Sequence, residues 1–214
     1  MNILVISAHP DDEVLGMGGT IKKLTQNGHN VHLCVVSEGT SAQYSDKKMI
    51  KVRQNSCKNS SKILGIKNTS FFDFPDQKLD TIPHLEINQE LEKIIKKFKP
   101  IVVYTTPNND LNQDHQKVFE STLVATRPFL TSVKQILVYE LPSITKFPFH
   151  PNVFQDITKE FSYKIKAFKK YHSEIEDFPH TRSIEALESL AIHRGYESGF
   201  KKAESFCLIR DSIL

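Results

Sequence analysis

Cysteine is scarce in this sequence, with three among 214 residues. Cys34, Cys57 and Cys207 are odd in number and far apart, which fits neither a disulfide framework nor a zinc knuckle built from cysteines. The pattern therefore indicates a protein of a reducing compartment, and we expect it in the cytoplasm.

Long apolar runs and a strong charge of either sign are also missing. No apolar stretch approaches the roughly 20 residues that a membrane-spanning helix needs. The first residues, Met1 to Ser7, carry no basic side chain, and their apolar run is too short for a secretory signal, so they predict a strand. The 28 Lys and Arg against 25 Asp and Glu give a formal net charge of +3, too small to indicate nucleic-acid binding. We therefore expect neither a transmembrane segment nor a nucleic-acid partner.

What is present is the composition of an ordinary globular protein, with 39% hydrophobic and 25% charged residues. The length predicts one domain that spans residues 1–214. Short β-branched runs alternate with longer amphipathic stretches, which is typical of parallel strands joined by crossover helices. The fold class we predict is a single-domain, Rossmann-like α/β protein whose mostly parallel sheet is flanked by helices. The expected strands are residues 3–7, 31–37, 70–74, 101–105 and 135–140.

The last third of the chain has a different pattern. Residues 147–152 are loop-like, and helical stretches follow at 159–171 and 183–193. We expect the C-terminal segment, residues 147–214, to pack at the sheet edge and to cover the rim where ligands bind.

The motif that carries chemistry is Ala8-His9-Pro10-Asp11-Asp12-Glu13, which directly follows the first expected strand. In an open α/β sheet, ligands bind beyond the carboxyl ends of the strands, so this motif lies where function is expected. An imidazole nitrogen and a carboxylate oxygen suit Zn²⁺, and a catalytic zinc site needs three protein ligands plus an open position for water. His9 and Asp12 supply two ligands, and Asp11 is free to act as a base if it points elsewhere.

A third ligand should come from the end of another strand. The expected strand 101–105 runs into a polar loop that ends at His115, where a helical pattern begins. His115 is therefore the candidate for the third ligand. A surface histidine at the start of a helix is the alternative.

The glycines after the first motif leave a weaker interpretation open. Gly16-Met17-Gly18-Gly19 follows a strand, as a dinucleotide-binding turn does, and Glu38 stands where such a fold carries an acidic residue. The spacing G-x-G-x-x-G is not met, however, and three acidic residues in the preceding turn would repel a pyrophosphate. A dinucleotide-binding Rossmann protein is thus an alternative, but a poor one.

These motifs resemble those of the LmbE/PIG-L family of zinc-dependent N-deacetylases, which act on N-acetylglucosamine-type sugars. Residues 8–13 match the family's first motif, Ala-His-Pro-Asp-Asp-Glu, without change. Residues 112–115, Asn-Gln-Asp-His, correspond to its second motif, His-x-Asp-His. Supporting similarity extends over nearly the whole chain, at residues 37–40, 63–65, 194–195 and 203–206.

The resemblance implies a hydrolase that removes the acetyl group from an N-acetylated amino sugar or its conjugate, with one Zn²⁺ as cofactor. It implies zinc bound by His9, Asp12 and His115, with zinc-bound water as the nucleophile and Asp11 as the general base. Arg53 resembles a family position that contacts the substrate, and a salt bridge on a helix surface is the alternative role. The partner is then a small molecule, and an oligomer is possible.

One position departs from the family pattern. Asn112 stands where the family has a histidine that assists the oxyanion or the leaving group, and an amide donates a hydrogen bond but cannot deliver a proton. Either Asp11 carries out both proton transfers, or His150 or His180 of the C-terminal segment assists. Asp114 is expected to orient a ligand or the region of Asn112. A sugar-binding relative that has lost turnover is the alternative function that this departure leaves open.

Overall fold

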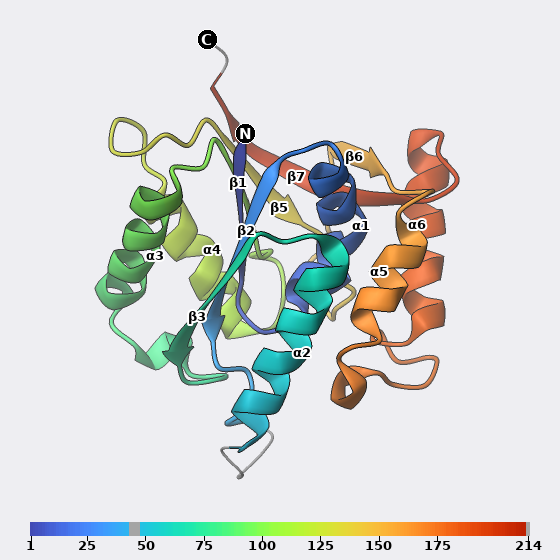
Figure 1. Ribbon diagram of the computed structural model, residues 1–214, viewed down its shortest axis with the longest axis horizontal. Coiled ribbons are helices and arrows are strands. Elements are labelled where there is room, and N and C mark those ends of the chain that lie inside the picture. The colour runs from blue at the N-terminus through green and yellow to red at the C-terminus, as the bar shows by residue number, and fades with distance from the viewer. Residues whose placement is uncertain (43–47, 213–214) are drawn as a thin grey trace.

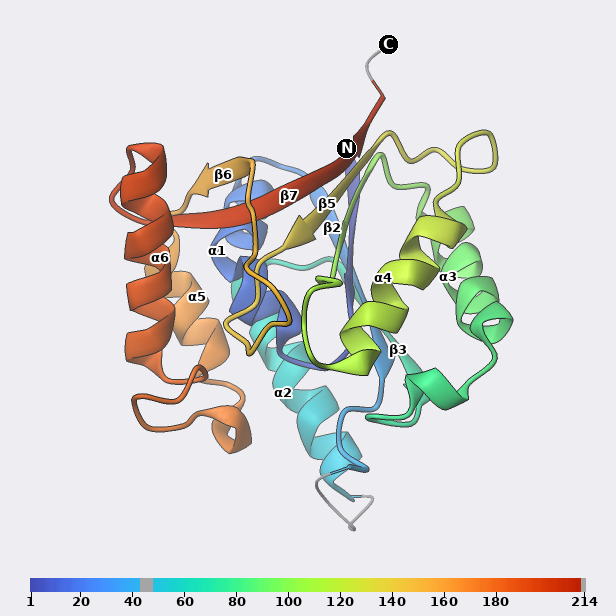
Figure 2. The ribbon, with the colours of Figure 1, turned by 180° about the vertical axis from the view of Figure 1, so that it is seen from behind.

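The computed structural model describes residues 1–42 and 48–212. A seven-stranded sheet forms its centre, and helices cover both faces (Figures 1 and 2). The strands are β1 (Asn2–Ser7), β2 (Asn30–Ser37), β3 (Asn68–Phe74), β4 (Val102–Thr105), β5 (Gln135–Tyr139), β6 (Val153–Asp156) and β7 (Ala203–Asp211). The α-helices are α1 (Asp12–Gln26), α2 (Lys48–Leu64), α3 (His84–Phe98), α4 (Gln113–Ala125), α5 (Phe161–Phe168) and α6 (Ile184–Ser198). Within the described ranges, no helix combines the length and the apolar character needed to cross a membrane.

The strand order is β3-β2-β1-β4-β5-β7-β6. β1 pairs in parallel with β2 on one side and with β4 on the other, and β3 and β5 extend the parallel part outward. β7 runs antiparallel to both of its neighbours, β5 and β6. The prediction of a single α/β domain with a mostly parallel sheet is confirmed.

The ends of all five predicted strands agree with the structure to within two residues. The prediction missed β6 and β7, which carry weak patterns. Every residue of β6 is half-buried, and the first half of β7 contains the buried polar residues Glu204 and Ser205. The apolar run of β7, residues 206–209, has polar residues on both sides, so neither strand shows a clean alternation of apolar and polar side chains. The two predicted C-terminal helices correspond to α5 and α6.

Two hydrophobic cores lie on the two faces of the sheet. Helices α1, α2 and α5 cover one face, and α3 and α4 cover the other (Figure 1). Along β1, Ile3 and Val5 belong to the first core and Leu4 and Ile6 to the second, because successive side chains of a strand point to opposite faces. This explains why the first strand is apolar from Ile3 to Ile6: it is buried on both sides.

The strand order reverses between β1 and β4. The chain leaves β1 for β2 and β3 on one side, then returns across the sheet to β4 on the other. In open α/β sheets the ligand crevice forms at such a reversal, beyond the carboxyl ends of the strands. The loops after β1 and β4 carry the two predicted motifs, so the topology brings these motifs together.

The glycines of the first motif lie inside α1 rather than in the turn before it. A Cβ atom at Gly16 would lie 2.4 Å from the ring of Tyr139, and one at Gly19 would lie 2.8 Å from Ile157. These glycines therefore allow α1 to pack closely against β5 and the loop before α5. Glu38 accepts a hydrogen bond from the backbone N–H of Thr40 at 2.9 Å and so closes its own loop. The structure gives the dinucleotide-binding alternative no support.

Candidate functional site

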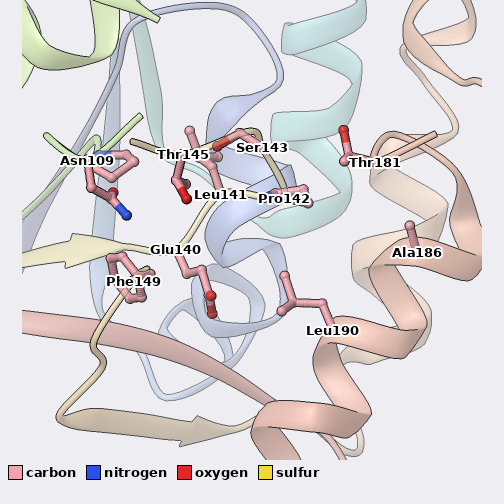
Figure 3. A pocket seen from close by; sticks show the side chains of 11 residues that line it. Asn109, Glu140, Leu141, Pro142, Ser143, Thr145, Phe149, Thr181, Ala186 and Leu190 are labelled. Carbon is pink, nitrogen blue, oxygen red and sulfur yellow. The ribbon is translucent and has the colours of Figure 1, made fainter. Parts of the chain in front are cut away.

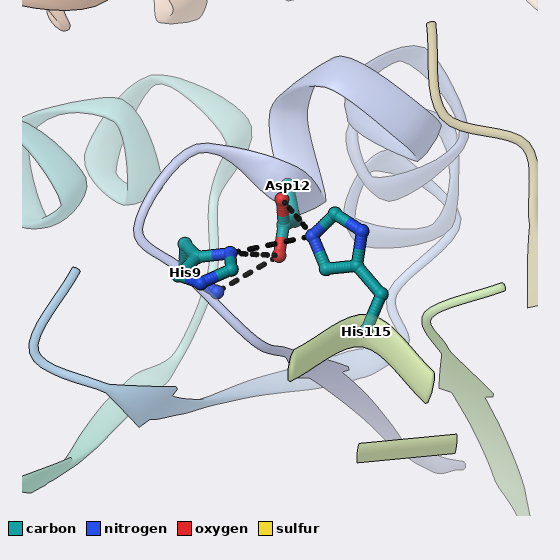
Figure 4. A group of neighbouring side chains, drawn as sticks. All are labelled: His9, Asp12 and His115. Atoms are coloured by element: carbon teal, nitrogen blue, oxygen red, sulfur yellow. Dashed lines mark hydrogen bonds and ion pairs between the residues drawn. The ribbon is translucent and has the colours of Figure 1, made fainter. Parts of the chain in front are cut away.

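Two imidazoles and one carboxylate converge beyond the carboxyl ends of β1 and β4 (Figure 4). His9 lies in the turn after β1, Asp12 begins α1, and His115 lies in the first turn of α4. The Nδ1 atom of His9 is 3.3 Å from Nε2 of His115, which in turn is 3.3 Å from Oδ1 of Asp12. Nδ1 of His9 is 3.7 Å from Oδ2 of Asp12. All three side chains are buried.

These spacings fit a tetrahedral metal ion. With zinc–ligand distances of about 2.0–2.2 Å, two ligand atoms of a tetrahedron lie about 3.3–3.6 Å apart. The 3.3 Å between the two imidazole nitrogens and the 3.3 Å from Nε2 of His115 to Oδ1 of Asp12 agree with that geometry, while Nδ1 of His9 lies 3.7 Å from the other oxygen of that carboxylate, Oδ2. Two imidazole nitrogens plus a carboxylate oxygen are donors that zinc accepts. The three residues therefore fit a zinc ion with one position left for water.

Each histidine has carboxylates on the side away from Asp12, and these determine which of its ring nitrogens faces the ligand cluster. Nδ1 of His115 donates to Oδ2 of Asp110 at 2.8 Å. Nε2 of His9 lies 3.1 Å from Oδ2 of Asp114 and 3.1 Å from Oδ1 of Asp76. A histidine that donates through one ring nitrogen presents a lone pair on the other. The lone pairs of the two histidines are thereby placed next to Asp12.

His9, Asp76 and Asp114 form a second group with spacings suitable for a metal. The oxygens of Asp114, however, already accept hydrogen bonds from the backbone N–H groups of Gln77, at 2.8 Å, and Leu79, at 3.0 Å. Asp114 thus connects His9 to the loop after β3. We assign this group to the orientation of His9 rather than to a second metal site.

Buried carboxylates around the ligand cluster favour positive charge at its two histidines. Burial by itself would raise the pKa of Asp12, but the charge of His115 and hydrogen bonds from both histidines hold this pKa well below its usual range. Burial would lower the pKa of His115, yet Asp12 and Asp110 raise it to about 9. Burial would likewise lower the pKa of His9, which hydrogen bonds to Asp114, Asp12 and Asp76 hold well above its usual value. A divalent cation that replaces these protons would meet the same negative charge.

Asp11 is adjacent to the cluster but makes different contacts. Its side chain is fully buried, and neither carboxylate oxygen has a hydrogen-bond partner in the described part of the chain. Burial raises the pKa of this carboxyl, while the guanidinium groups of Arg182 and Arg53 act in the opposite direction. The backbone of Asp11 has φ 130° and ψ −24°, a strained conformation for a residue with a side chain. A buried carboxylate with free lone pairs beside a metal site is suitable for a general base.

Two arginines from distant parts of the chain converge on Asp11. Arg53 of α2 and Arg182 of the loop before α6 each place a guanidinium nitrogen 3.4 Å from Oδ2 of Asp11. Both also contact Oε2 of Glu174, at 3.3 and 2.9 Å respectively. Arg53 is 3% exposed and donates to the carbonyl of Pro10 at 2.9 Å. The alternative of a surface salt bridge for Arg53 is therefore wrong, because the side chain is buried beside the site.

The C-terminal segment also stabilises the turn that carries the first motif. Tyr171 donates its hydroxyl to Oε1 of Glu13 at 2.6 Å, and Oε2 of Glu13 accepts the backbone N–H of Asp11 at 3.2 Å. Burial raises the pKa of Glu13 to about 8, against the effect of the hydrogen bond from Tyr171. The last residue of the motif thus maintains the turn between β1 and α1.

Asn112 caps helix α4. Its Oδ1 atom accepts the backbone N–H of Asp114 at 2.9 Å, as an N-cap residue does. His150 and His180, the proposed substitutes for the missing histidine, are both exposed. Within the described residues, neither has a hydrogen bond or ion pair with the ligand cluster or with Asp11. The structure therefore gives no support to a role for either histidine in proton transfer.

Four residues of the site were not predicted from the sequence. Asp76 and Asp110 lie just beyond the ends of β3 and β4, so a search for carboxylates after each strand would have found them. Glu174 ends a short 3₁₀ helix (His172–Glu174) and Arg182 lies in the loop before α6, both far along the chain, and no motif marks them. Only the packing of the C-terminal segment brings these two residues to Asp11.

The model of the PIG-L family, described as GlcNAc-PI de-N-acetylase, matches residues 4–126. This match covers more than half of the chain. The chain belongs to the PIG-L family. The resemblance seen in the two sequence motifs is thereby confirmed.

Two relatives of this PIG-L protein extend the match beyond those residues. A protein of Escherichia coli (strain K12) named uncharacterized deacetylase YaiS is 37% identical over 180 residues, which cover 80% of this chain and 90% of the relative. The diacetylchitobiose deacetylase of Thermococcus kodakarensis is 29% identical over 218 residues, covering 94% of this chain and 80% of that enzyme.

Solved structures share the fold of this PIG-L protein. The N,N'-diacetylchitobiose deacetylase of Pyrococcus horikoshii superimposes with a TM-score of 0.83 at 24% identity, covering 98% of this chain and 84% of that one. The 4-carboxy-2-hydroxymuconate hydratase of Pseudomonas putida also reaches 0.83, at 20% identity, covering 100% and 98%. One fold therefore accommodates two different reactions, and the reaction must be argued from the site.

Proposed function

We propose that this protein is a zinc-dependent N-deacetylase that hydrolyses the acetamide of an N-acetylated amino sugar or its conjugate. The observation that carries the proposal is the cluster of His9, Asp12 and His115 at zinc-like spacing, with the carboxylate of Asp11, which accepts no hydrogen bond within the described residues, beside it. Membership of the PIG-L family and similarity to a diacetylchitobiose deacetylase support the choice of an acetylated sugar.

In this proposal His9, Asp12 and His115 hold the ion. A bound zinc ion would polarise the acetyl carbonyl and lower the pKa of a water molecule. The carboxylate of Asp11 takes a proton from the attacking water and then returns it to the amine that leaves. Arg53 and Arg182 favour the ionised form of Asp11 before the reaction, because both guanidinium groups lie 3.4 Å from its Oδ2 atom.

Asn112 and the C-terminal segment complete the proposed site. The Oδ1 atom of Asn112 is engaged in the helix cap, so its amide N–H₂ is the group that remains to donate to an oxyanion. Asp11 then carries out both proton transfers, since the amide cannot supply a proton. The C-terminal segment covers the rim through Tyr171, Glu174 and Arg182, whose contacts with the first motif and Arg53 support this role.

The direct test combines metal analysis with an assay for products. The purified chain should bind one zinc ion per molecule, and it should release acetate and free amine in equal amounts from N-acetylated sugars. A chelator should stop the reaction and added zinc should restore it. A protein that binds zinc and sugar but releases no amine would contradict the deacetylase proposal and favour the sugar-binding alternative.

Arg182 provides a test of the role given to the C-terminal segment. We expect Arg182→Gln to lower kcat/KM by roughly 10–100-fold, the effect of losing a contact with a charged group of about 1.5–3 kcal/mol. The zinc content should not change, because Arg182 contacts Asp11 and Glu174 rather than a proposed ligand. Arg127→Gln is the matched control, since Arg127 pairs with Glu92 on the exposed surface. Wild-type activity in Arg182→Gln would show that the segment does not act on the site.

Two variants of Asn112 distinguish its structural role as a helix cap from a role in catalysis. Asn112→Ala should lower the free energy of unfolding by about 1 kcal/mol, because the N–H of Asp114 loses its partner. Asn112→Ser should retain most of the stability, since serine is also a good N-cap residue. Both variants should lose kcat if the amide donates to the oxyanion. Denaturant unfolding and steady-state kinetics measure the two effects, and full activity in Asn112→Ser would restrict Asn112 to the cap.

A further inference from the structure

We propose that the end of the molecule opposite the candidate site binds the surface of a lipid bilayer that contains anionic lipids. We name this end the distal surface. It combines the amino ends of the parallel strands, the loops and helix ends that precede them, and the carboxyl end of the antiparallel β7. Its residues are 1–2, 26–30, 62–68, 96–101, 126–134 and 209–212. The inference does not depend on the deacetylase function proposed above.

Backbone hydrogen bonds connect the segments of the distal surface. Ile101 donates its N–H to the carbonyl of Asn2 at 3.0 Å, and Lys134 donates to the carbonyl of Ile101 at 2.8 Å. Ser212 donates in turn to the carbonyl of Lys134 at 3.0 Å. The loop 126–134 projects from this end of the molecule, whereas the loops that carry the candidate site lie at the other end (Figures 1 and 2).

Two apolar side chains protrude from the loop 126–134. Phe129 is 104% exposed and Leu130 is 69% exposed, and Ile101 is a further exposed apolar residue of the same surface. Phe129 also has a backbone φ of 71°, which is strained for a bulky side chain. At that exposure Phe129 buries no apolar surface, so nothing in the fold compensates the strain. Burial of both side chains in an apolar phase would supply that compensation.

The distal surface is strongly positive. Its lysines and arginines are Lys62, Lys67, Lys96, Lys97, Lys99, Arg127, Lys134 and Arg210. Within these described ranges Asp211 is the one carboxylate, although the whole chain has 25 Asp and Glu. Lysines in the last turn of a helix are ordinary, but most of these cations lie in the loops that follow the helices. Among the described residues, Arg127 is the one cation of this surface that pairs with a carboxylate, that of Glu92 at 3.6 Å.

A hollow in the distal surface is lined by three of these cations. It lies between the ends of α3 and α4 and has a volume of about 520 Å³. Lys96, Lys99 and Arg127 line it, together with Leu130 and the carboxylate of Glu92. By contrast, the cavity of about 270 Å³ beyond β4 and β5, at the other end of the molecule, has no lysine or arginine among the described residues that line it (Figure 3). A lipid phosphate therefore finds cationic partners in the distal hollow and none in that cavity.

Apolar and cationic groups side by side favour a bilayer over other anionic partners. Phe129 and Leu130 can enter the boundary of the acyl chains, while the lysines around them remain at the level of the headgroups. A nucleic acid would engage the cations but would leave the apolar pair in water. A second copy of the chain that bound through the same surface would bring like charges together, which is unfavourable. The candidate site faces away from the bilayer in this arrangement.

An introduced tryptophan tests the position of the loop, because the sequence contains no tryptophan. We expect the emission of Phe129→Trp to shift to shorter wavelength with vesicles of phosphatidylcholine and phosphatidylglycerol, but not with vesicles of phosphatidylcholine alone. High salt should reverse the shift, because salt screens the attraction. Ile144→Trp is the control, since Ile144 is 73% exposed and follows β5 at the other end of the molecule. A shift without vesicles that grows with protein concentration would identify a second copy as the partner and overturn the inference.

Sedimentation with the same anionic vesicles measures the contribution of each kind of group. Phe129→Ser combined with Leu130→Ser should weaken binding by roughly 10–100-fold. Lys96→Gln combined with Lys99→Gln should weaken it by about 25-fold, at about fivefold for each charge near an anionic surface. Lys166→Gln combined with Lys169→Gln is the matched control, because it removes the same charge from exposed positions of α5 and should leave binding unchanged.

Zinc content, melting temperature and hydrolysis of N-acetylglucosamine should stay at the wild-type level in all of these variants, so a loss of binding would not reflect unfolding. The inference falls if the wild-type chain does not sediment with the anionic vesicles, or if the control pair weakens binding as much as the Lys96 and Lys99 pair. It also falls if the chain binds duplex DNA more tightly than the vesicles and the serine variants leave both affinities unchanged, which would indicate a nucleic acid as the partner.

Discussion

Replacing His115 with alanine is expected to abolish stoichiometric zinc binding and, with it, deacetylase activity. His115 places Nε2 3.3 Å from both His9 and Asp12, so its loss leaves two of the three proposed ligands. The effect on activity should exceed the roughly 10–100-fold loss that follows from removing a residue behind a ligand. Elemental analysis of the purified variant and an amine-release assay measure the two effects.

Asp110→Asn should weaken zinc binding less than His115→Ala does, and it therefore serves as the comparison for this prediction. Asp110 holds Nδ1 of His115 at 2.8 Å without belonging to the proposed ligand set, so its substitution should weaken zinc binding by roughly 10–100-fold. His193→Ala removes a histidine from the surface of α6 and should leave zinc content and activity unchanged. Full zinc occupancy in His115→Ala would contradict the ligand assignment, whatever the activity of the variant.

Asp11→Asn is expected to lower kcat by about 10²–10⁴-fold while zinc remains bound. This is the usual contribution of a positioned general base, and asparagine keeps the size of the side chain but cannot accept the proton. Asparagine is also among the residues that tolerate positive φ best, so the turn should be retained. The measurements are kcat, zinc content and the melting temperature.

Asp11→Asn should also have a measurable effect on the stability of the protein, because Asp11 lies among charged groups. Neutralising this carboxylate leaves Arg53 and Arg182 with Glu174 as their shared anionic partner, so the variant should also be less stable than the wild type. Arg53→Gln combined with Asp11→Asn should recover part of that stability, because it leaves Glu174 with one arginine in place of two. An Asp11→Asn variant with wild-type kcat and full zinc would show that another group acts as the base.

The shared fold does not choose among reactions, because a hydratase and a deacetylase have the same architecture as this chain. The difference must lie in the residues at the rim, and here these include the buried carboxylate of Asp11 and the two arginines that contact it. The predictions about the reaction therefore all concern side chains beyond the carboxyl ends of the strands. Substitutions in the cores would change stability without distinguishing one reaction from another.

Local patterns in the sequence were sufficient for the parallel part of the fold and for the two motifs. The first strand is apolar from Ile3 to Ile6 because both faces of the sheet are covered, and this is visible in a few consecutive residues. His9 and Asp12 follow that strand directly, and His115 begins the helix after β4, so the strand order places them together. Asp76 and Asp110 follow the same rule, although the predicted site did not include them.

The tertiary structure alone decided which distant groups surround Asp11 and whether Arg53 is buried. Glu174 and Arg182 lie more than 160 residues from Asp11, in a three-residue 3₁₀ helix and in a loop, where neither periodicity nor motif indicates a partner. Likewise β7 is defined by its pairing with β5 and β6, and β6 by its pairing with β7, rather than by an alternating pattern of their own. Periodicity records how a side chain relates to its own helix or strand, whereas long-range contacts depend on how separate elements pack. The motifs at the strand ends could therefore be predicted from the sequence, whereas the charged groups and the cavity around these motifs could not.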